Sequence, residues 1–348
     1  IYYIYLLYQF NCIREYMNKT FKNQNILITG GTGSFGNQFI ETMLKKFTFN
    51  KLAIFSRDEL KQYEMSQKYK DKRLRFLIGD IRDSDRIEYA LKDIDVVIHA
   101  AALKHVPVAE YNPSEFIKTN IIGSENVIKA SIKNNVKKVI SLSTDKAAAP
   151  INLYGATKLV ADKLFSSANN MIGSKNLIFS SVRYGNVLNS RGSIIPLFKK
   201  LRSQKKPLTI TNLDTTRFFL SLEEGVNFVI NCLSIMKGGE IFVPKIPSVK
   251  ITDLANALYP DAKIQIIGMR PGEKIHEVLI SSNENNVSEF SNFYVIHPTI
   301  NLNKKINYEM YNKMKGHKTK ENFQYESSQK KFLLNKNSLK QFLKKLDC

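Results

Sequence analysis

The segment that most constrains the fold is a glycine-rich turn directly after a short apolar run. Residues 25–29 read NILIT and continue into TGGTGSFG at residues 29–36, followed by an amphipathic stretch. This spacing fits both G-x-G-x-x-G and G-x-x-G-x-x-G, a strand-to-helix turn whose backbone can approach a pyrophosphate. We therefore expect a dinucleotide site here, with a tight turn that binds no ligand as the alternative. The residues expected at the site are Gly30, Thr32, Gly33, Ser34, Phe35 and Gly36.

The first half of the chain alternates short apolar runs with amphipathic stretches, the pattern of βα units that build a parallel sheet. Because crossovers between parallel strands are right-handed, six such strands form a doubly wound sheet. We expect an α/β fold with a doubly wound parallel Rossmann sheet and a smaller α/β substrate-binding lobe. Strands are expected at Asn25–Thr29, Lys51–Phe55, Leu74–Ile78, Asp95–His99, Lys137–Leu142 and Leu177–Arg183, and helices at Ser34–Lys46, Glu59–Lys70, Ser84–Leu91, Pro113–Asn134 and Leu153–Asn169.

Beyond Gly185 this alternation breaks into shorter, proline-containing pieces. We expect residues 17–184 to form the dinucleotide-binding domain, with the catalytic residues, and residues 185–300 to form mainly the substrate-binding lobe. Residues 301–348 are expected to be a Lys-rich C-terminal extension whose polar part, residues 313–331, is a loop or surface appendage. Residues 1–16 precede the first methionine and are expected to lie upstream of the fold.

The charge balance bears on the partners of the chain. The 348 residues carry a net charge of +21, from 52 Lys and Arg against 31 Asp and Glu, which raises nucleic acid as a partner. Only 11 of the basic residues are Arg, the type favoured for reading bases, and the lysines are spread along the chain. We therefore expect no nucleic-acid partner, and a small molecule that carries phosphate instead.

Hydropathy and cysteine usage bear on location. No apolar run reaches the roughly 18–20 residues that span a bilayer. The longest candidate, Ile1–Ile13, has its first positive charge behind it, unlike a signal peptide. The three cysteines are scattered, which is typical of a reducing compartment. We expect a cytoplasmic protein with no membrane partner. No metal is expected, because no ligand spacing links His99, His105, His276, His297 and His317.

Three further segments are placed to contact the dinucleotide. Ser56, Arg57, Asp58 and Lys61 follow the second strand, where an acid would bind the ribose of NAD and an Arg the 2′-phosphate of NADP. The three donors favour NADP, with Asp58 as a plain helix N-cap as the alternative reading. The second segment is the pair expected to flank the adenine, Asp80 and Ile81. The third is the small-residue turn expected near the nicotinamide ribose, which contains Ala100, Ala101, Ala102 and Lys104.

The fifth strand ends in Ser-Thr-Asp-Lys at residues 143–146, and Tyr154 and Lys158 follow on one face of a helix. An ammonium close to a phenol lowers its pKa, so such a Tyr can take a proton from a substrate hydroxyl. A Tyr and a Lys at this spacing also occur by chance on exposed helices. With a strand that ends in Ser/Thr just before them, they indicate a Ser/Thr–Tyr–Lys catalytic set at Thr144, Tyr154 and Lys158.

Together these features resemble the extended short-chain dehydrogenase/reductase superfamily, and longer runs narrow the resemblance. GGTGSFG, SRDELKQYEM, HAAALKHVPVAEYNP, STDKAAAPINLYGATK, VRYGNVL-x-SRGS and GMRPGEKIHEVLI are similar to runs of the inverting UDP-N-acetylglucosamine 4,6-dehydratases of bacterial surface-sugar pathways. The similarity extends over residues 23–298. Retaining dehydratases carry Asp-Glu where this chain has Asp145-Lys146, and 4-epimerases lack an acid/base pair there.

This resemblance implies an NADP-dependent hydro-lyase that dehydrates UDP-N-acetylglucosamine and inverts C5. Oxidation at C4 makes the C5 proton removable, so the reaction needs a group at O4, a base at C5 and an acid at O6. Tyr154 is expected at O4. Lys146 can be the base if its pKa is lowered, and Asp145 the acid if burial raises its pKa. A structural ion pair of Asp145 and Lys146 is the alternative.

The resemblance also implies substrate contacts and assembly. Two arginines of the second half are expected to neutralise the UDP pyrophosphate, with a glutamate near the nucleoside, and the chain is expected to form a homo-oligomer, by resemblance a hexamer. The alternatives are a 4-epimerase, a retaining dehydratase or a non-catalytic NADP-binding module. The residues expected to bind substrate are Lys104, Asn186, Arg217, Arg270 and Glu273.

Overall fold

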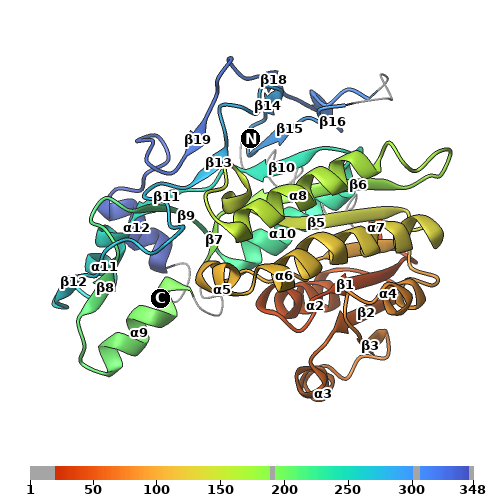
Figure 1. The fold of residues 1–348 in the computed structure, drawn as a ribbon, viewed down its shortest axis with the longest axis horizontal. Helices are drawn as coiled ribbons and strands as arrows, with labels where there is room; N and C mark the ends of the chain where they lie inside the picture. Colours follow the sequence, from red (N-terminus) through yellow and green to blue (C-terminus); the bar gives the residue numbers. More distant parts are fainter. Residues whose placement is uncertain (1–19, 189–192, 301–305, 345–348) are drawn as a thin grey trace, which may run out of the picture.

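In the computed structural model, which describes residues 20–188, 193–300 and 306–344, the chain is built around one large twisted sheet (Figure 1). Within the described residues the sheet has ten strands in the order β18-β14-β15-β10-β6-β5-β4-β1-β2-β3. The strands from β3 to β10 in this order are parallel. Strand β15 pairs antiparallel with β10, and β14 pairs antiparallel with β15. The expected α/β fold class is thus confirmed, while residues 1–16 lie outside the described part.

The elements of the first half follow the hydrophobic pattern closely, and most ends lie within two residues of those expected. The central strands are buried on both faces, as in other parallel sheets, whereas the edge strand at residues 74–78 is partly exposed. The elements are β1 (Asn25–Thr29), α2 (Ser34–Lys46), β2 (Lys51–Ser56), α3 (Glu59–Lys68), β3 (Leu74–Ile78), α4 (Ser84–Ala90), β4 (Val96–His99), α5 (Val106–Tyr111), α6 (Pro113–Phe116), η1 (Ile117–Ile122), α7 (Gly123–Lys133), β5 (Lys138–Thr144), η2 (Asp145–Ala147), α8 (Leu153–Ala168) and β6 (Ile178–Tyr184).

One expected helix differs. The stretch Pro113–Asn134 was expected to be continuous, but it contains a π-helical turn, η1, between α6 and α7. Such turns widen a helix and often lie next to functional sites. Here the turn holds Asn120, whose amide bonds to the loop after β4 and to α8. The π-helical turn therefore places the Asn120 side chain for these hydrogen bonds. Hydropathy alone does not reveal such polar contacts.

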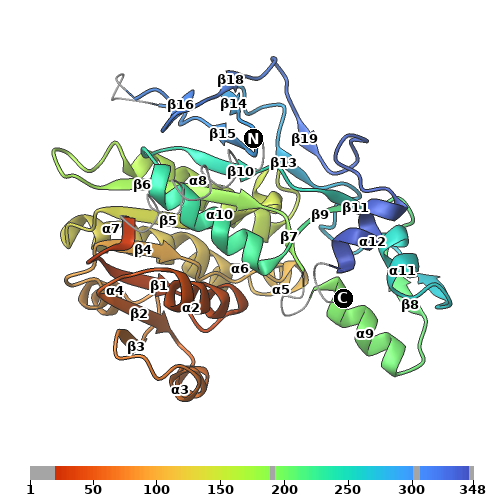
Figure 2. The same cartoon turned by 180° about the vertical axis from the view of Figure 1, so that it is seen from behind.

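Helices cover both faces of the sheet. Figure 1 shows α7 and α8 on the near face, with α4 packed on α7, and Figure 2 shows α2 and α10 (Leu222–Ile235) packed together on the other face. Alternate side chains of each strand enter the two cores: Ile26 and Ile28 pack with Phe39 of α2, whereas Leu27 packs with Val127 of α7. The carboxyl ends of the parallel strands are thereby held at one edge of the sheet.

The second half continues this sheet and adds a smaller lobe. Strand β10 pairs with β6, and the segment expected to be a loop contributes β18 to the sheet edge and β19 to a pair with β13. The lobe gathers α9, α11, α12 and short strands around Phe198 and Leu254. The elements are β7 (Asn186–Val187), α9 (Ile194–Ser203), β8 (Leu208–Ile210), β9 (Thr216–Leu220), β10 (Ile241–Pro244), β11 (Ser248–Lys250), α11 (Ile251–Leu258), β12 (Ile264–Ile266), β13 (Val278–Ile280), β14 (Val287–Glu289), β15 (Phe293–Ile296), β16 (Met310–Tyr311), β17 (Met314–Lys315), β18 (His317–Lys318), β19 (Tyr325–Glu326) and α12 (Lys336–Lys344).

A buried carboxylate before β10 makes stability depend on pH. Glu240 has no exposed surface, and its carboxylate accepts the Lys237 backbone N–H at 2.6 Å. Burial raises the pKa of Glu240 to about 7 from an ordinary value of 4.5. The pKa of this carboxyl is therefore higher in the folded than in the unfolded protein. As the pH rises from 4.5 to about 7, the free energy of unfolding falls by about 3 kcal/mol.

We expect Glu240→Gln to remove this pH-dependent loss, since the amide keeps the shape but carries no charge. Its thermal midpoint should exceed that of the wild type at about pH 8 and match it at about pH 4. Exposed Glu309 provides the control, because Glu309→Gln should change neither midpoint. An equal difference at both pH values for Glu240→Gln would contradict the buried-charge account.

Candidate active site

The glycine-rich turn between β1 and α2 has the geometry that a bound pyrophosphate requires. Gly30 has a φ of +65°, and a Cβ there would lie 2.9 Å from the Ala101 Cα. A Cβ on Gly36 would lie 2.0 Å from the carbonyl oxygen of Gly31, so only glycine lets α2 start this close to the turn. None of the described side chains caps α2 at Gly33, and its first turn contains no acid. The turn therefore fits an anionic dinucleotide. The Phe35 ring packs on Phe39 instead, with ring centroids 6.2 Å apart.

A buried hydrogen-bond chain fixes the small residues that follow β4. Thr29 Oγ1 accepts the backbone N–H groups of Ala100 and Ala101, both at 3.2 Å, and lies 2.9 Å from His99 Nδ1. Because this oxygen already accepts, its own proton points to Nδ1. Burial lowers the pKa of His99 to about 3, so the ring stays neutral. Thr29 thus holds the Ala100–Ala101 backbone beside the glycine turn and His99 orients the Thr29 hydroxyl, roles that sequence reasoning missed.

Asn120 of η1 anchors the rest of this loop. Its Oδ1 accepts the Leu103 N–H at 2.9 Å, and its Nδ2 donates to the Leu103 carbonyl at 2.9 Å and to Thr157 Oγ1 of α8 at 3.0 Å. The loop bearing Lys104 is thereby tied to the helix that carries Tyr154. Lys104 itself is exposed, and partial desolvation lowers its pKa. An Asn inside an otherwise apolar helical pattern was the signal that could have revealed the anchor.

At the end of β2, three of the residues expected to contact the cofactor form hydrogen bonds or ion pairs with residues at the start of α3. Asp58 caps α3 by accepting the Lys61 N–H at 3.0 Å, and the Lys61 ammonium pairs with the same carboxylate. The buried Ser56 Oγ accepts from Gln62 Nε2 at 3.0 Å. The N-cap reading of Asp58 is therefore confirmed.

The remaining donor at this end is Arg57, whose side chain is 55% exposed and lies 3.8 Å from Asp80 Oδ2. Asp80 accepts from the Arg82 guanidinium at 2.8 and 2.6 Å. Burial raises the pKa of Asp80, but the bonds from Arg82 outweigh it and hold that pKa below its ordinary value. Ile81 is buried and would meet a Cβ on Gly123 at 2.7 Å. Arg57 is thus the most exposed of these donors.

The expected catalytic residues come together at the carboxyl end of β5. The Thr144 hydroxyl donates to Asp145 Oδ1 at 2.9 Å, and Lys158 Nζ donates to the Leu142 carbonyl at 2.8 Å. A Cβ on Gly155 would lie 2.2 Å from the Lys146 carbonyl oxygen, so this glycine lets α8 approach η2. Burial raises the pKa of Tyr154 to about 12, and the Lys146 charge opposes the rise. Burial also lowers the pKa of Lys158.

Lys146 lies between two buried carboxylates. Its Nζ is 3.0 Å from Asp145 Oδ1 and 3.0 Å from Glu277 Oε1. Asp145 is 1% exposed, and its Oδ1 also accepts the Thr144 hydroxyl at 2.9 Å. The second oxygens of both carboxylates, Asp145 Oδ2 and Glu277 Oε2, are buried without a hydrogen-bond partner among the described residues. A basic and an acidic group therefore stand side by side next to Tyr154.

These neighbours decide the charges. Burial raises the pKa of Asp145, as expected of an acid, and the Glu277 charge adds to the rise while Lys146 opposes it. For Lys146, burial lowers the pKa, but the two carboxylates outweigh burial and raise it above the ordinary value. The lowered pKa that the sequence analysis required of Lys146 is therefore not found. The reason is the charge of Asp145 together with that of Glu277. Sequence reasoning missed Glu277, although it lies within the run GMRPGEKIHEVLI.

The second half brings Arg217 to this cluster, but not as a free phosphate donor. Its guanidinium donates to Glu273 Oε1 at 2.9 Å and to the Thr216, Ile275 and Lys274 carbonyls, and its Nε lies 3.6 Å from Glu277 Oε1. All three of its nitrogens are thus engaged within the chain. Arg217 and Glu273 therefore form a salt bridge within the chain.

The other expected substrate residues are more open. Arg270 is exposed, and its backbone N–H donates to Glu273 at 3.3 Å. Asn186 of β7 has a buried Oδ1 without a partner among the described residues. Lys274, which the sequence analysis did not select, donates to the Ala148 carbonyl at 2.8 Å, and burial lowers its pKa. The segment 270–277 therefore lies against η2.

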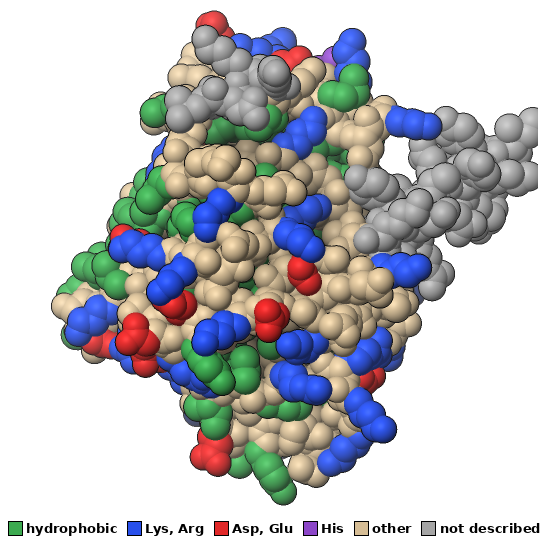
Figure 3. Space-filling model, turned by 90° about the vertical axis from the view of Figure 1, so that its right-hand side faces the viewer, with side chains coloured by type: hydrophobic (Ala, Val, Ile, Leu, Met, Phe, Trp, Pro, Cys, Tyr) green, Lys and Arg blue, Asp and Glu red, His purple; other side chains and the backbone are tan. Residues whose placement is uncertain are grey.

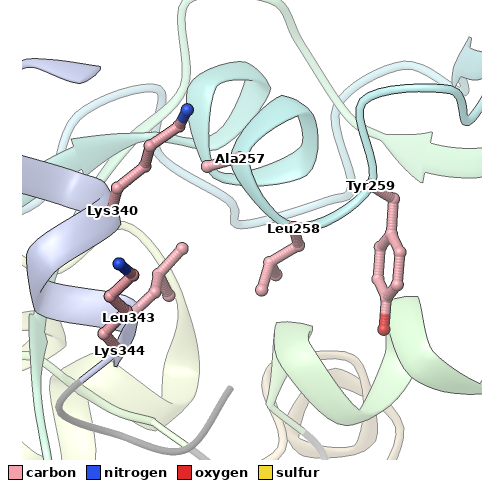
Figure 4. A pocket seen from close by; sticks show the side chains of 6 residues that line it. All are labelled: Ala257, Leu258, Tyr259, Lys340, Leu343 and Lys344. Carbon is pink, nitrogen blue, oxygen red and sulfur yellow. The ribbon is translucent and has the colours of Figure 1, made fainter. Parts of the chain in front are cut away.

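Other surface features lie apart from this site. A hollow of about 260 Å³ between α11 and α12 is lined by Tyr259, Lys340 and Leu343 with their neighbours, none of which was expected to bind ligand (Figure 4). On the face drawn in Figure 3, Lys and Arg side chains are scattered among acidic ones. The described residues contain no helix long and apolar enough to cross a membrane, and no group of three potential metal ligands.

Comparison with known proteins agrees with this geometry. Residues 26–298 match the family model described as polysaccharide biosynthesis protein. The chain is 55% identical over 311 residues to a UDP-N-acetylglucosamine 4,6-dehydratase (inverting) of Campylobacter jejuni, which covers 88% of this chain and 93% of the relative. It is 45% identical to a UDP-glucose 4-epimerase of Rickettsia bellii, over 79% of this chain and 83% of that protein.

Solved structures show the same architecture. The X-ray structure of Pen from Bacillus thuringiensis superposes with a TM-score of 0.86 at 37% identity, over 94% of this chain and 99% of that one. The dTDP-glucose 4,6-dehydratase DesIV from Streptomyces venezuelae, solved with NAD and TYD bound, superposes with a TM-score of 0.66 at 21% identity, over 72% and 86% of the two chains. The latter likeness concerns the fold alone.

Proposed function

The chain belongs to the polysaccharide biosynthesis protein family that includes the inverting UDP-N-acetylglucosamine 4,6-dehydratases, and from this we propose that it dehydrates UDP-N-acetylglucosamine and inverts C5. The product would be UDP-2-acetamido-2,6-dideoxy-β-L-arabino-hex-4-ulose, for surface-glycan or sialic-acid-like sugar synthesis. The observation that carries the proposal is the Asp145–Lys146 pair beside Tyr154. A 4-epimerase has no use for a second acid and base at this point.

Each of the three proton transfers up to the loss of water has a candidate residue here. Tyr154 takes the proton of the C4 hydroxyl. Lys146 takes the C5 proton, which is acidic once C4 is a ketone. Asp145, whose raised pKa favours its protonated form, gives a proton to the departing C6 hydroxyl. The 3.0 Å contact between Lys146 and Asp145 lets a proton pass between them, which forms the neutral pair that these two steps need.

A nicotinamide dinucleotide bound at the glycine-rich turn supplies the hydride acceptor for C4 and the hydride donor for C6. The residues proposed to hold it are those of the turn at residues 30–36, the end of β2 and the loop at residues 100–104. Thr29 and His99 keep that loop beside the turn. Arg270, Asn186 and Lys104 are proposed to bind the substrate, with Arg217 and Glu273 shaping its site as a pair.

Purified protein incubated with UDP-N-acetylglucosamine tests the proposed reaction. We expect a product lighter by one water, with a C6 methyl group and a C4 ketone by NMR and with no net consumption of cofactor. Formation of the C4 epimer without loss of water would support an epimerase instead. Dehydration with an unchanged C5 would support a retaining dehydratase, and an unaltered sugar would support a binding module.

The cofactor is proposed to be NADP, because Ser56, Arg57 and Lys61 supply donors for a 2′-phosphate. Arg57 is half-exposed and only loosely paired, so it is the donor best placed to turn to a phosphate. We expect NADP to bind apo-protein more tightly than NAD, and Arg57→Ala to weaken NADP alone by about ten- to hundredfold. Calorimetric titration with both cofactors measures this. Tighter binding of NAD by the wild type would exclude the assignment.

By the same family resemblance, we propose a cytoplasmic homo-oligomer, with a hexamer as the first expectation. No nucleic acid or membrane partner is proposed. The charge distribution on the face in Figure 3 supports this, because its basic side chains are interspersed with acidic ones.

A further inference from the structure

The residue that connects the two halves of the site most directly is Glu277, immediately before β13. Its side chain is 3% exposed, and its Oε1 lies 3.0 Å from Lys146 Nζ, across 131 residues of sequence. Lys146 has no other carboxylate partner among the described residues except Asp145. Glu277 therefore provides half of the ionic environment of the proposed C5 base.

The fold holds Glu277 rigidly. Its backbone N–H donates to Ser327 Oγ at 2.8 Å, and the Ser327 N–H donates back to the Glu277 carbonyl at 2.9 Å. Ser327 Oγ also lies 2.7 Å from Thr216 Oγ1. These bonds continue the β13–β19 pair, so the C-terminal segment supports the carboxylate that faces Lys146. A side chain fixed at both its backbone and its carboxylate restricts the position of the ammonium that it binds.

The charges around Lys146 distinguish the two carboxylates. Besides Asp145 and Glu277, the groups that act on this cluster are Arg217 of β9, Lys274 of the preceding loop and Tyr154 of α8. Burial raises the pKa of Glu277, but Lys146 and Arg217 outweigh burial and keep it lowered, whereas that of Asp145 is raised. Of the two carboxylates, Asp145 therefore takes up a proton more readily, and Glu277 is the one favoured as the ionised partner of Lys146.

We propose that Glu277 is a positioning residue for Lys146: its carboxylate fixes the ammonium beside Asp145 and sets the pH at which the lysine becomes neutral. The role of Glu277 in catalysis rests on the proposed function, in which Lys146 is the C5 base. The effect of its charge on Lys146 does not depend on that function. A charge within about 4–6 Å changes a pKa by about one to three units. Removing the Glu277 charge should lower the pKa values of both Lys146 and Asp145, since it raises both.

The first test needs no substrate. At fixed pH below the titration of the lysines, acetic anhydride labels each lysine in proportion to its neutral fraction. In Glu277→Gln protein, labelling of Lys146 should increase at least about tenfold relative to exposed Lys199, measured by peptide mass spectrometry. Glu284→Gln is the matched control, because Glu284 pairs with Arg183 at 2.9 Å and not with Lys146. It should leave the labelling ratio unchanged.

The second test uses turnover of UDP-N-acetylglucosamine. The pH profile of kcat should move to lower pH by about one to three units in Glu277→Gln, and by less in Glu277→Asp, which keeps the charge but withdraws it. Glu277→Asp also serves if the Gln protein does not fold. A lower rate with an unmoved profile and an unchanged Lys146 labelling ratio would overturn the proposal. If wild-type protein leaves the sugar unaltered, the proposed function fails, whereas the labelling ratio still decides the role of Glu277.

Discussion

Lys146→Ala should lower the rate of dehydration by about 10²- to 10⁴-fold, the usual contribution of one general base. The substitution removes the group proposed to take the C5 proton and leaves the glycine-rich turn intact, so dinucleotide affinity should not change. Product formation by NMR and cofactor titration measure the two effects. Lys129→Ala, which removes an exposed lysine paired with Glu125, should retain full activity.

Lys146→Arg separates proton transfer from charge. Alanine leaves Asp145 and Glu277 buried without their cation, which can destabilise the fold. Arginine keeps the positive charge and both ion pairs but does not lose its proton in proteins, so it cannot act as a base. We expect a folded protein that binds cofactor and dehydrates as slowly as Lys146→Ala. Near-normal turnover in either variant would show that another group removes the C5 proton.

Tyr154→Phe should block the reaction one step earlier. The hydroxyl that it loses is the one proposed to take the C4 proton. We expect turnover to fall by about 10²- to 10⁴-fold and no absorbance of reduced nicotinamide to develop on adding substrate. Lys146→Arg should still develop that absorbance, because its defect lies after oxidation. If Tyr154→Phe reduced the cofactor at the wild-type rate, Tyr154 would not be the C4 base.

The cofactor-binding part of the fold was readable from sequence because its determinants are local. The turn after β1 follows from glycine spacing, and the parallel strands follow from short apolar runs. The π turn was not predictable in this way, since it depends on Asn120 bonding to Leu103 and Thr157. The short C-terminal strands were missed because two-residue strands such as β18 and β19 have no periodicity, and their pairing partners are distant in sequence.

In the candidate site, too, the residues close in sequence were predictable and the contacts between distant residues were not. Thr144, Asp145, Lys146, Tyr154 and Lys158 lie within 15 residues and were found together, because one strand end and one helix position them. Their charges were not predictable, since Glu277 reaches Lys146 from 131 residues away. The pairing of Arg217 with Glu273 was likewise hidden, because the two residues are 56 positions apart in the sequence.

The configuration of the product formed in D₂O tests the central claim most directly. Removal of the C5 proton by Lys146 and return of a proton from the opposite face, by water or another acid, require that the new hydrogen at C5 come from solvent. NMR of the product should therefore show deuterium at C5, the β-L-arabino configuration, and at C6 a hydrogen derived from C4 of the substrate. A product that keeps the D-configuration at C5 would contradict the assignment of this chain as an inverting dehydratase with Lys146 as its base.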